Sequence, residues 1–199
     1  MSEILGILAT AIGLIGYGPY LWKTAKGQVR PHIFSWFLWG ILTGIGFAAQ
    51  VTGEGGFSAG TWVTGMSAAA SFIGAGLAFY HGGKRDITKS DWIVFAGVMA
   101  AIPVWVLTDS PFWSVILITF IDAAAFAPTF RKGWQKPNED SVFVFLCSGI
   151  KYAVALLALQ HYTVVTALFP ASLVLTNGAF ITMLLLRRHS FKNQPACDV

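Results

Sequence analysis

Seven long runs of apolar residues follow one another along the chain, separated by short polar segments. The runs cover about Ile4–Trp22, Ile33–Thr52, Thr61–Tyr80, Asp91–Thr108, Phe112–Phe130, Val142–Gln160 and Thr163–Leu186. Each is about 20 residues long, the length of helix that crosses the hydrocarbon core of a bilayer. The apolar positions are continuous rather than alternating, which favours helices over strands, and a helix satisfies its own backbone in lipid. The pattern predicts an all-α membrane protein with seven transmembrane helices.

Composition excludes several other classes of protein. Of the 199 residues, 55% are hydrophobic and 11% are charged, whereas soluble domains carry roughly 25% charged residues. The net charge is +4, but the basic residues lie in short segments between apolar runs rather than along one helix face. We therefore expect membrane lipid and a small-molecule solute as partners, and no nucleic acid.

The sequence contains no motif that is typical of an enzyme or a metal site. Its two cysteines, Cys147 and Cys197, make no disulfide framework and do not have the spacing of a zinc site. No cluster of histidine and cysteine and no nucleophile elbow is present. We expect no catalytic residue, no metal and no cofactor.

Basic residues gather on one side of the predicted membrane. Segments after the first, third, fifth and seventh runs contain Lys23, Lys26, Arg30, Lys84, Arg85, Lys89, Arg131, Lys132, Lys136, Arg187, Arg188 and Lys192. The other side has no lysine or arginine, and its charged residues are Glu3, Glu54 and Asp109. The positive-inside rule places the amino terminus outside and the carboxy terminus in the cytoplasm. The first run lacks the features of a cleavable signal peptide, and the short tail favours a prokaryotic inner membrane.

An internal repeat relates the first three runs to the last three. The segment Gly16–Lys23 reads GYGPYLWK and Ala125–Lys132 reads AFAPTFRK, each with an aromatic residue two positions before proline and a lysine four positions after it. Both following segments contain Pro-x-x-x-Ser, at Pro31 and at Pro137. Two like-oriented three-helix units need an odd number of helices between them. The repeat predicts a 3+1+3 layout with parallel repeats: residues 1–81, a linker helix in 82–111, residues 112–188, and a cytoplasmic tail in 189–199.

The prolines of the repeat, Pro19 and Pro128, lie near the cytoplasmic ends of their runs. Proline removes a backbone hydrogen bond and permits a kink. Alone, such a proline is typical of a helix terminator, but two at matched positions favour a hinge.

These motifs resemble the PQ-loop superfamily. It includes the SWEET sugar transporters, lysosomal amino-acid exporters such as cystinosin, Pnu-type vitamin transporters and the KDEL receptors. Tyr20 and Thr129 stand where the named motif has glutamine. The resemblance implies a transporter with a central cavity between two three-helix bundles, and it leaves the solute unidentified.

Polar residues within the runs are the candidate binding site, because an ionisable group inside a bilayer is costly. Asp122, Lys151 and Asn177 lie within the fifth, sixth and seventh runs. At about 1.5 Å rise per residue, Asp122 and Lys151 both lie about 12–14 Å from the cytoplasmic face, and Asn177 is level with them. Asp122 and Lys151 are expected to form either a buried ion pair that locks the second repeat or part of a solute-binding or proton-coupling site.

The repeat predicts that the cavity is asymmetric. Aligning the two units places Gly13 opposite Asp122, Ile45 opposite Lys151 and Ser71 opposite Asn177. In the SWEETs that the chain resembles, a polar residue of the third span and an asparagine of the seventh face the sugar. The resemblance therefore implies that Ser71 and Asn177 contact the solute.

Tryptophans fall into two groups. Four lie near span ends, as in an interfacial belt: Trp22, Trp92, Trp113 and Trp134. Trp36 and Trp39 open the second run and suit either stacking on a solute or packing between helices. Trp62 and Trp105 are interpreted as anchors or packing residues.

Together these observations predict a carrier for a small polar solute, such as a sugar, a nucleoside or vitamin, or an amino acid, that works by alternating access. The alternative is a membrane receptor of the same fold that binds a ligand without transporting it. Both halves are present in one chain, so a monomer could be competent, and a homo-oligomer is also compatible. Proton or ion coupling stays open.

Overall fold

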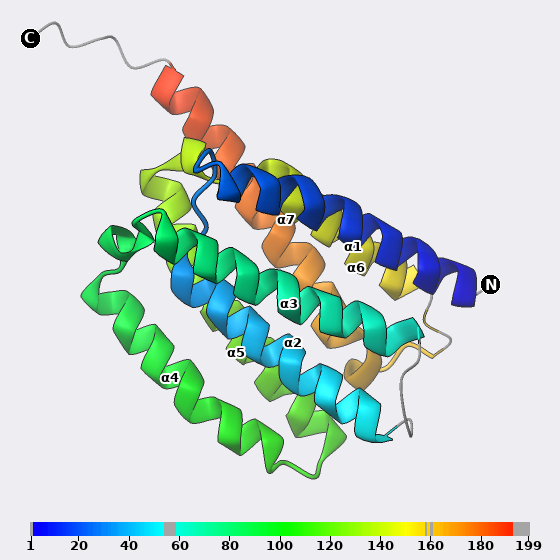
Figure 1. The fold of residues 1–199 in the computed structure, drawn as a ribbon. Helices are drawn as coiled ribbons and strands as arrows, with labels where there is room; N and C mark the ends of the chain where they lie inside the picture. Colours follow the sequence, from blue (N-terminus) through cyan, green and yellow to red (C-terminus); the bar gives the residue numbers. More distant parts are fainter. Residues whose placement is uncertain (1, 54–58, 158, 160, 193–199) are drawn as a thin grey trace, which may run out of the picture.

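The computed structural model describes residues 2–53, 59–157, 159 and 161–192, and within them it contains seven α-helices and two short 3-10 turns (Figure 1). The elements are α1 (Ser2–Ala25), α2 (Ile33–Gly53), α3 (Ala59–Tyr80), η1 (Gly83–Asp86), α4 (Lys89–Val106), α5 (Pro111–Gln135), η2 (Pro137–Glu139), α6 (Val142–Leu157) and α7 (Val164–Lys192). Each helix coincides with most of one predicted apolar run. The all-α class is therefore confirmed.

Helix α5 extends beyond the apolar run that predicted it. It ends at Gln135 rather than Phe130, so Arg131 and Lys132 are helical and not part of a loop. Cations in the last turn of a helix interact favourably with its partial negative charge. A hydropathy pattern detects only the apolar part of such a helix.

The carboxy-terminal helix also extends beyond its apolar run into a polar segment that hydropathy does not detect. α7 continues past the predicted end at Leu186 to Lys192, so the residues 189–192 assigned to the tail are helical. Residues 193–199 lie outside the described part of the chain. α6 ends at Leu157, before the predicted end at Gln160, which also lies outside the described residues.

Three of the described helical segments are long and apolar enough to cross a membrane. They are Lys89–Val106, Phe112–Gln135 and Val164–Ser190. Shorter apolar helices are present at Ile33–Ala48, Gly65–Tyr80 and Val142–Leu157. These lengths and compositions are typical of a helical membrane protein.

Many large apolar side chains of the described residues are exposed on the surface, whereas several polar side chains are buried. Ile93, Leu107 and Leu175 are each more than 70% exposed, at 74%, 79% and 72%. By contrast, Asp122 and Asn177 are buried. Large exposed apolar surfaces mark contact with lipid or protein, and polar groups of membrane helices face the interior. This distribution suits a bilayer better than water.

The helices pack in a pattern that pairs distant parts of the chain. α3 contacts α1 and α2, and α7 contacts α5 and α6. Between these groups, α1 lies along α6 and α2 along α5, while α4 packs on the outside against α5 and, less extensively, α2 (Figure 1). The seven helices therefore form one bundle, with α4 at its periphery (Figure 1).

Two apolar clusters hold the bundle together. Among described residues, the first includes Trp36, Phe126, Phe145 and Phe180, and the ring centroids of Phe145 and Phe180 lie 4.4 Å apart. The second joins α2, α4 and α5 through residues such as Leu38, Val98 and Ile121. α2 and α5 contribute to both clusters.

Close approach of α1 and α6 depends on a glycine. A Cβ atom added to Gly16 would lie only 2.7 Å from the Cβ of Cys147. Small residues let membrane helices approach closely, as the glycines of the first run suggest. Because the Cβ of Cys147 is fixed to its backbone, it cannot rotate away from a larger residue.

We expect Gly16→Ala to destabilise the protein by about 1–3 kcal/mol, the usual cost of overpacking, measured by thermal unfolding in detergent. Gly76→Ala on an exposed part of α3 is the matched control, since a Cβ there meets no atom within 4 Å outside its own chain neighbours. Adding Cys147→Gly to Gly16→Ala removes the opposing Cβ and should restore stability. Equal effects of the two alanine substitutions would contradict this account.

Candidate binding cavity

A cavity of about 410 Å³ lies inside the bundle, with a lining drawn from all seven α-helices. Small-molecule sites have volumes of about 300–1,000 Å³, so it has room for a small solute. All six residues that the sequence nominated for binding line this cavity: Trp36, Trp39, Ser71, Asp122, Lys151 and Asn177. The structure thus brings together residues from five helices that are far apart in the chain.

Asp122 and Lys151 both reach the cavity, but they do not form the expected ion pair. No ion pair within 4.0 Å joins them in the described structure. The reason is the order of the helices: α6 packs mainly against α1 and α7, while α5 packs against α2, α4 and α7. Although α5 and α6 are consecutive in the chain, they are not close partners in space, and among the described residues a direct pair that locks the second repeat is absent.

Lys151 reaches toward α1 instead. A Cβ atom on Gly13 would lie 3.2 Å from the Cδ of Lys151, so the glycine leaves room for the lysine stem. The Nζ atom lies 4.4 Å from the ring centroid of Tyr152, a favourable cation–π distance. The ammonium group is thus held by an aromatic face at the cavity wall.

Asn177 and Ser71, the matched residues of α7 and α3, are both buried and both line the cavity. The Nδ2 of Asn177 donates a hydrogen bond of 2.7 Å to the backbone oxygen of Leu173, one turn earlier. Its carboxamide oxygen is left to accept a hydrogen bond from another group. Their placement agrees with the pairing that the repeat predicts.

Trp36 and Trp39 combine packing with cavity lining. Trp36 stacks on Tyr20 with centroids 4.6 Å apart and an interplanar angle of 11°, and it occupies space left by Gly74 on α3. Trp39 lies 4.5 Å from Phe126. Within the described residues, neither indole N–H has a hydrogen-bond partner. Both tryptophans therefore pack between helices and also line the cavity, where they could contact a solute.

The sequence analysis missed several lining residues. Tyr17 and Phe126 line the cavity, and they are the aromatic residues two positions before the repeat prolines. Their matched places in the motif were the signal that could have found them. Trp105 also lines the cavity, and its Nε1 donates to Ser114 Oγ at 2.9 Å. Nothing in the sequence separates it from an interfacial tryptophan.

Neither repeat proline terminates its helix. Pro19 lies inside α1, which continues to Ala25, and Pro128 lies inside α5, which continues to Gln135. The alternative of a terminator is therefore wrong. Each proline separates the cavity-lining part of its helix from a final helical segment that leads to the basic end of the bundle.

The tryptophans expected at the interfaces are exposed. Trp22, Trp92, Trp113 and Trp134 are each more than half exposed. Lys26 lies over Trp22 and Arg187 over Trp134. The side chain of Trp62 lies outside the described part of the structure.

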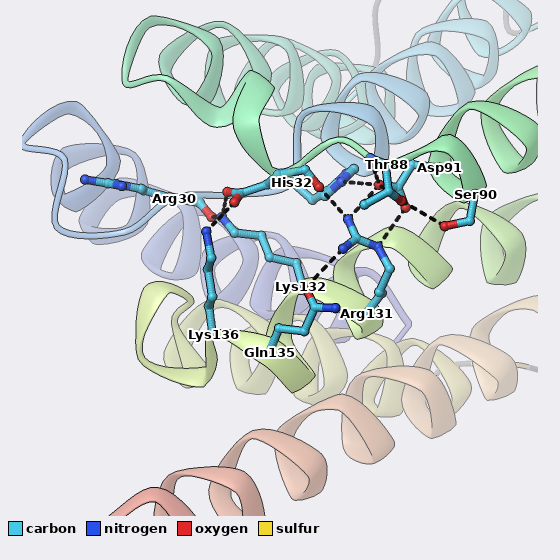
Figure 2. Close-up of polar contacts among 10 residues, drawn as sticks. Arg30, His32, Thr88, Ser90, Asp91, Arg131, Lys132, Gln135 and Lys136 are labelled. Carbon is cyan, nitrogen blue, oxygen red and sulfur yellow. Dashed lines mark hydrogen bonds and ion pairs between the residues drawn. The ribbon is translucent and has the colours of Figure 1, made fainter. Parts of the chain in front are cut away.

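A network of charges occupies the end of the bundle where the α1–α2, α3–α4 and α5–α6 connections meet (Figure 2). We call this the basic-end network, and it comprises Arg30, His32, Asp86, Asp91, Arg131, Lys132, Lys136 and Glu139. Its centre is a fork in which Arg131 Nε lies 3.0 Å from Asp91 Oδ1 and Nη2 lies 2.6 Å from Asp91 Oδ2. Such bidentate pairs are strong and geometrically specific. Asp91 also accepts hydrogen bonds from Thr88 in a capping box at the start of α4.

Lys132 extends the network to the loops. Its buried ammonium donates to the backbone oxygen of Arg30 and lies 3.2 Å from Asp86 and 3.4 Å from Glu139. The backbone nitrogen of Arg30 donates to the oxygen of Glu139 at 2.8 Å. Burial raises the pKa of Asp86, but hydrogen bonds and attraction from Lys136 and Lys132 outweigh it, so the pKa lies below its ordinary value. These contacts tie three connections together at this end of the bundle.

Tyr20 and Asp140 form a second link at the same end. The Tyr20 hydroxyl donates to Asp140 Oδ1 at 3.3 Å, and Arg188 donates to the backbone oxygen of Asp140 at 2.6 Å. Burial raises the pKa of Asp140 to about 6. α1 and α7 are thereby fastened to the loop between α5 and α6.

His32 is buried beside the fork. Burial lowers its pKa to about 4; Asp91 opposes this shift, and Arg131 and Lys132 add to it. Its Nε2 lies 3.4 Å from Asp91 Oδ2, yet neither ring nitrogen makes a hydrogen bond to a described residue. The imidazole is neutral at pH 7.

We expect acid to destabilise the protein through His32. Its folded pKa lies below the ordinary value of 6.5, so the unfolded chain binds the proton more readily and stability falls as pH drops from 6.5 toward 4. The full effect is on the order of 3 kcal/mol. In the His32→Gln variant, the thermal midpoint should fall less than in the parent protein as the pH drops over this window. The His161→Gln variant, changed on an exposed loop, should lose as much as the parent protein. Equal acid sensitivity in both variants would refute the assignment.

Comparison of the chain with protein-family models, with curated proteins and with solved structures found no match. The case for a function therefore rests on the chain's own residues and geometry.

Proposed function

We propose that this chain is a transmembrane carrier that moves a small polar solute by alternating access. The observation that carries the proposal is the cavity of about 410 Å³, lined by residues of all seven helices, among them an acid and a base that form no ion pair with each other. An ionisable group within a membrane helix is a functional-site candidate by default.

The packing pattern supports a 3+1+3 arrangement. Replacing α1, α2 and α3 by α5, α6 and α7 turns the α1–α3 and α2–α3 contacts into α5–α7 and α6–α7, and it exchanges α1–α6 with α2–α5. All of these pairs are observed. Parallel repeats related by an axis along the membrane normal have this property, with α4 as the linker. The PQ-loop resemblance, SWEETs included, fits the same arrangement.

Seven spans with the basic end in the cytoplasm agree with the surface of the molecule. The described outer faces of the helices are largely apolar, and the basic end lies opposite the amino terminus (Figure 1). By the positive-inside rule, the carboxy terminus is cytoplasmic and the amino terminus lies outside.

The basic-end network is the cytoplasmic gate in this proposal. Arg131 and Lys132 belong to the final segment of α5, beyond Pro128, and Tyr20 belongs to the final segment of α1, beyond Pro19. Bending at the two prolines would move these segments together with their partners. The cavity would open to the cytoplasm when the fork and the lysine contacts separate.

Counterflow in proteoliposomes tests the carrier directly, with sugars, nucleosides, vitamins and amino acids as the panel. We expect one class to exchange across the membrane, and we expect Gly13→Leu to abolish exchange because its side chain would fill space beside Lys151. Gly97→Leu, on an exposed part of α4 with open space around it, is the matched control. Binding of a solute without counterflow would instead identify a receptor.

Breaking the fork should favour the state that is open to the cytoplasm. We expect Arg131→Gln to increase labelling of a Ser148→Cys reporter in the cavity by an impermeant thiol reagent applied from the basic side. The background carries Cys147→Ala and Cys197→Ser, and Arg85→Gln, an exposed arginine outside the network, is the control. Unchanged labelling in a folded Arg131→Gln protein would remove the network from the gating mechanism.

A further inference from the structure

Within the described residues, the acid and the base at the cavity form no ion pair within 4.0 Å, either with each other or with another side chain, and they attract each other only across a longer distance. Asp122 is 7% exposed, and no hydrogen bond or ion pair joins its carboxylate to a described residue. Lys151 has the Tyr152 ring beside its ammonium and no carboxylate within 4.0 Å in the described structure. An unpaired charge in a low-dielectric interior costs several kcal/mol, so each group favours a counter-charge from whatever occupies the cavity.

The two charges lie on separate walls. Asp122 projects from α5, whereas the stem of Lys151 lies against Gly13 of α1. With a neutral solute such as a sugar, the two groups would have only their mutual attraction across the cavity, and a solute with one charge would pair with only one of them. A solute that carries an ammonium and a carboxylate neutralises both.

The remaining lining describes the body of such a solute. Aromatic rings of Tyr17, Trp39, Phe126 and Phe169 belong to the lining, which suits an apolar or aromatic group. The carboxamide oxygen of Asn177 can accept a hydrogen bond from an ammonium group. The site thus combines an anion, a cation and an apolar wall.

We propose that the carried solute is an amino-acid-like zwitterion with an apolar body, whose ammonium group meets Asp122 and whose carboxylate meets Lys151. The inference rests on the proposed function and narrows its solute to one chemical class. It also gives the asymmetry of the repeat a purpose: Gly13, the counterpart of Asp122, admits Lys151 to the cavity.

Binding to the purified full chain in detergent, measured by calorimetry, tests the solute class. The probes share one aromatic body: phenylalanine with both charges, phenethylamine with the cation only, and 3-phenylpropionate with the anion only; leucine is a second zwitterion and glucose is the neutral probe. We expect the zwitterions to bind about tenfold or more tightly than either singly charged probe, since each charge-assisted contact contributes that much. This comparison needs no variant and is unaffected by misfolding.

Two substitutions test the assignment of each charge. Asp122→Asn should weaken binding of phenylalanine and phenethylamine by about tenfold or more and spare 3-phenylpropionate. Lys151→Met should weaken phenylalanine and 3-phenylpropionate and spare phenethylamine. Asp109→Asn and Lys89→Met, at exposed positions, are the matched controls and should leave all affinities unchanged.

The outcomes separate this inference from the carrier itself. Failure of both zwitterions to bind, or equal affinity for charged and neutral probes, overturns the zwitterion assignment, while counterflow of another solute would leave the carrier intact. Tight zwitterion binding without counterflow supports the assignment and overturns the carrier.

Discussion

A charge inside a low-dielectric bundle needs a counter-charge or water. This requirement accounts for the placement of charges both at the cavity and at the basic end. Asp122 and Lys151 lie on different walls of a cavity that residues of all seven helices line. Separating them in this way costs free energy that a direct ion pair would recover. The cost is acceptable where the missing partner is a ligand, which is why the separation is the strongest functional signal in the structure.

The charges at the basic end follow the opposite rule. There Asp91 meets Arg131 in a fork, and Lys132 lies among Asp86, Glu139 and a backbone carbonyl. The molecule therefore has one set of charges left open and another that is mutually satisfied. The open set suits recognition of a solute, whereas the satisfied set suits a closed gate, because it must break before the connections can part.

Glycines allow close approach at several contacts between helices. Gly16 brings α1 against Cys147 of α6, and Gly13, about one turn away on the same helix, leaves room for Lys151. Gly74 similarly accommodates Trp36. At both levels α1 and α6 approach closely: helix packs on helix at Gly16, and the lysine stem packs on the helix at Gly13.

The seven helices could be predicted from the sequence alone, because apolar runs of membrane-spanning length leave few alternatives. Polar groups within apolar runs are rare and nominated Asp122, Lys151 and Asn177, the repeat added Ser71, and the aromatic start of the second run added Trp36 and Trp39. The helix ends at Gln135 and Lys192 could not be predicted in this way, because polar final turns carry no hydropathy signal.

The neighbours of each helix could be seen only in the folded structure. Adjacency in the chain suggested that Asp122 and Lys151 would pair, but α6 lies mainly between α1 and α7, and the ion pair does not form. The partners of Arg131 and the place of Trp105 in the cavity were likewise decided by packing. Contacts between helices depend on the shapes of entire faces, which residue spacing along one helix does not encode.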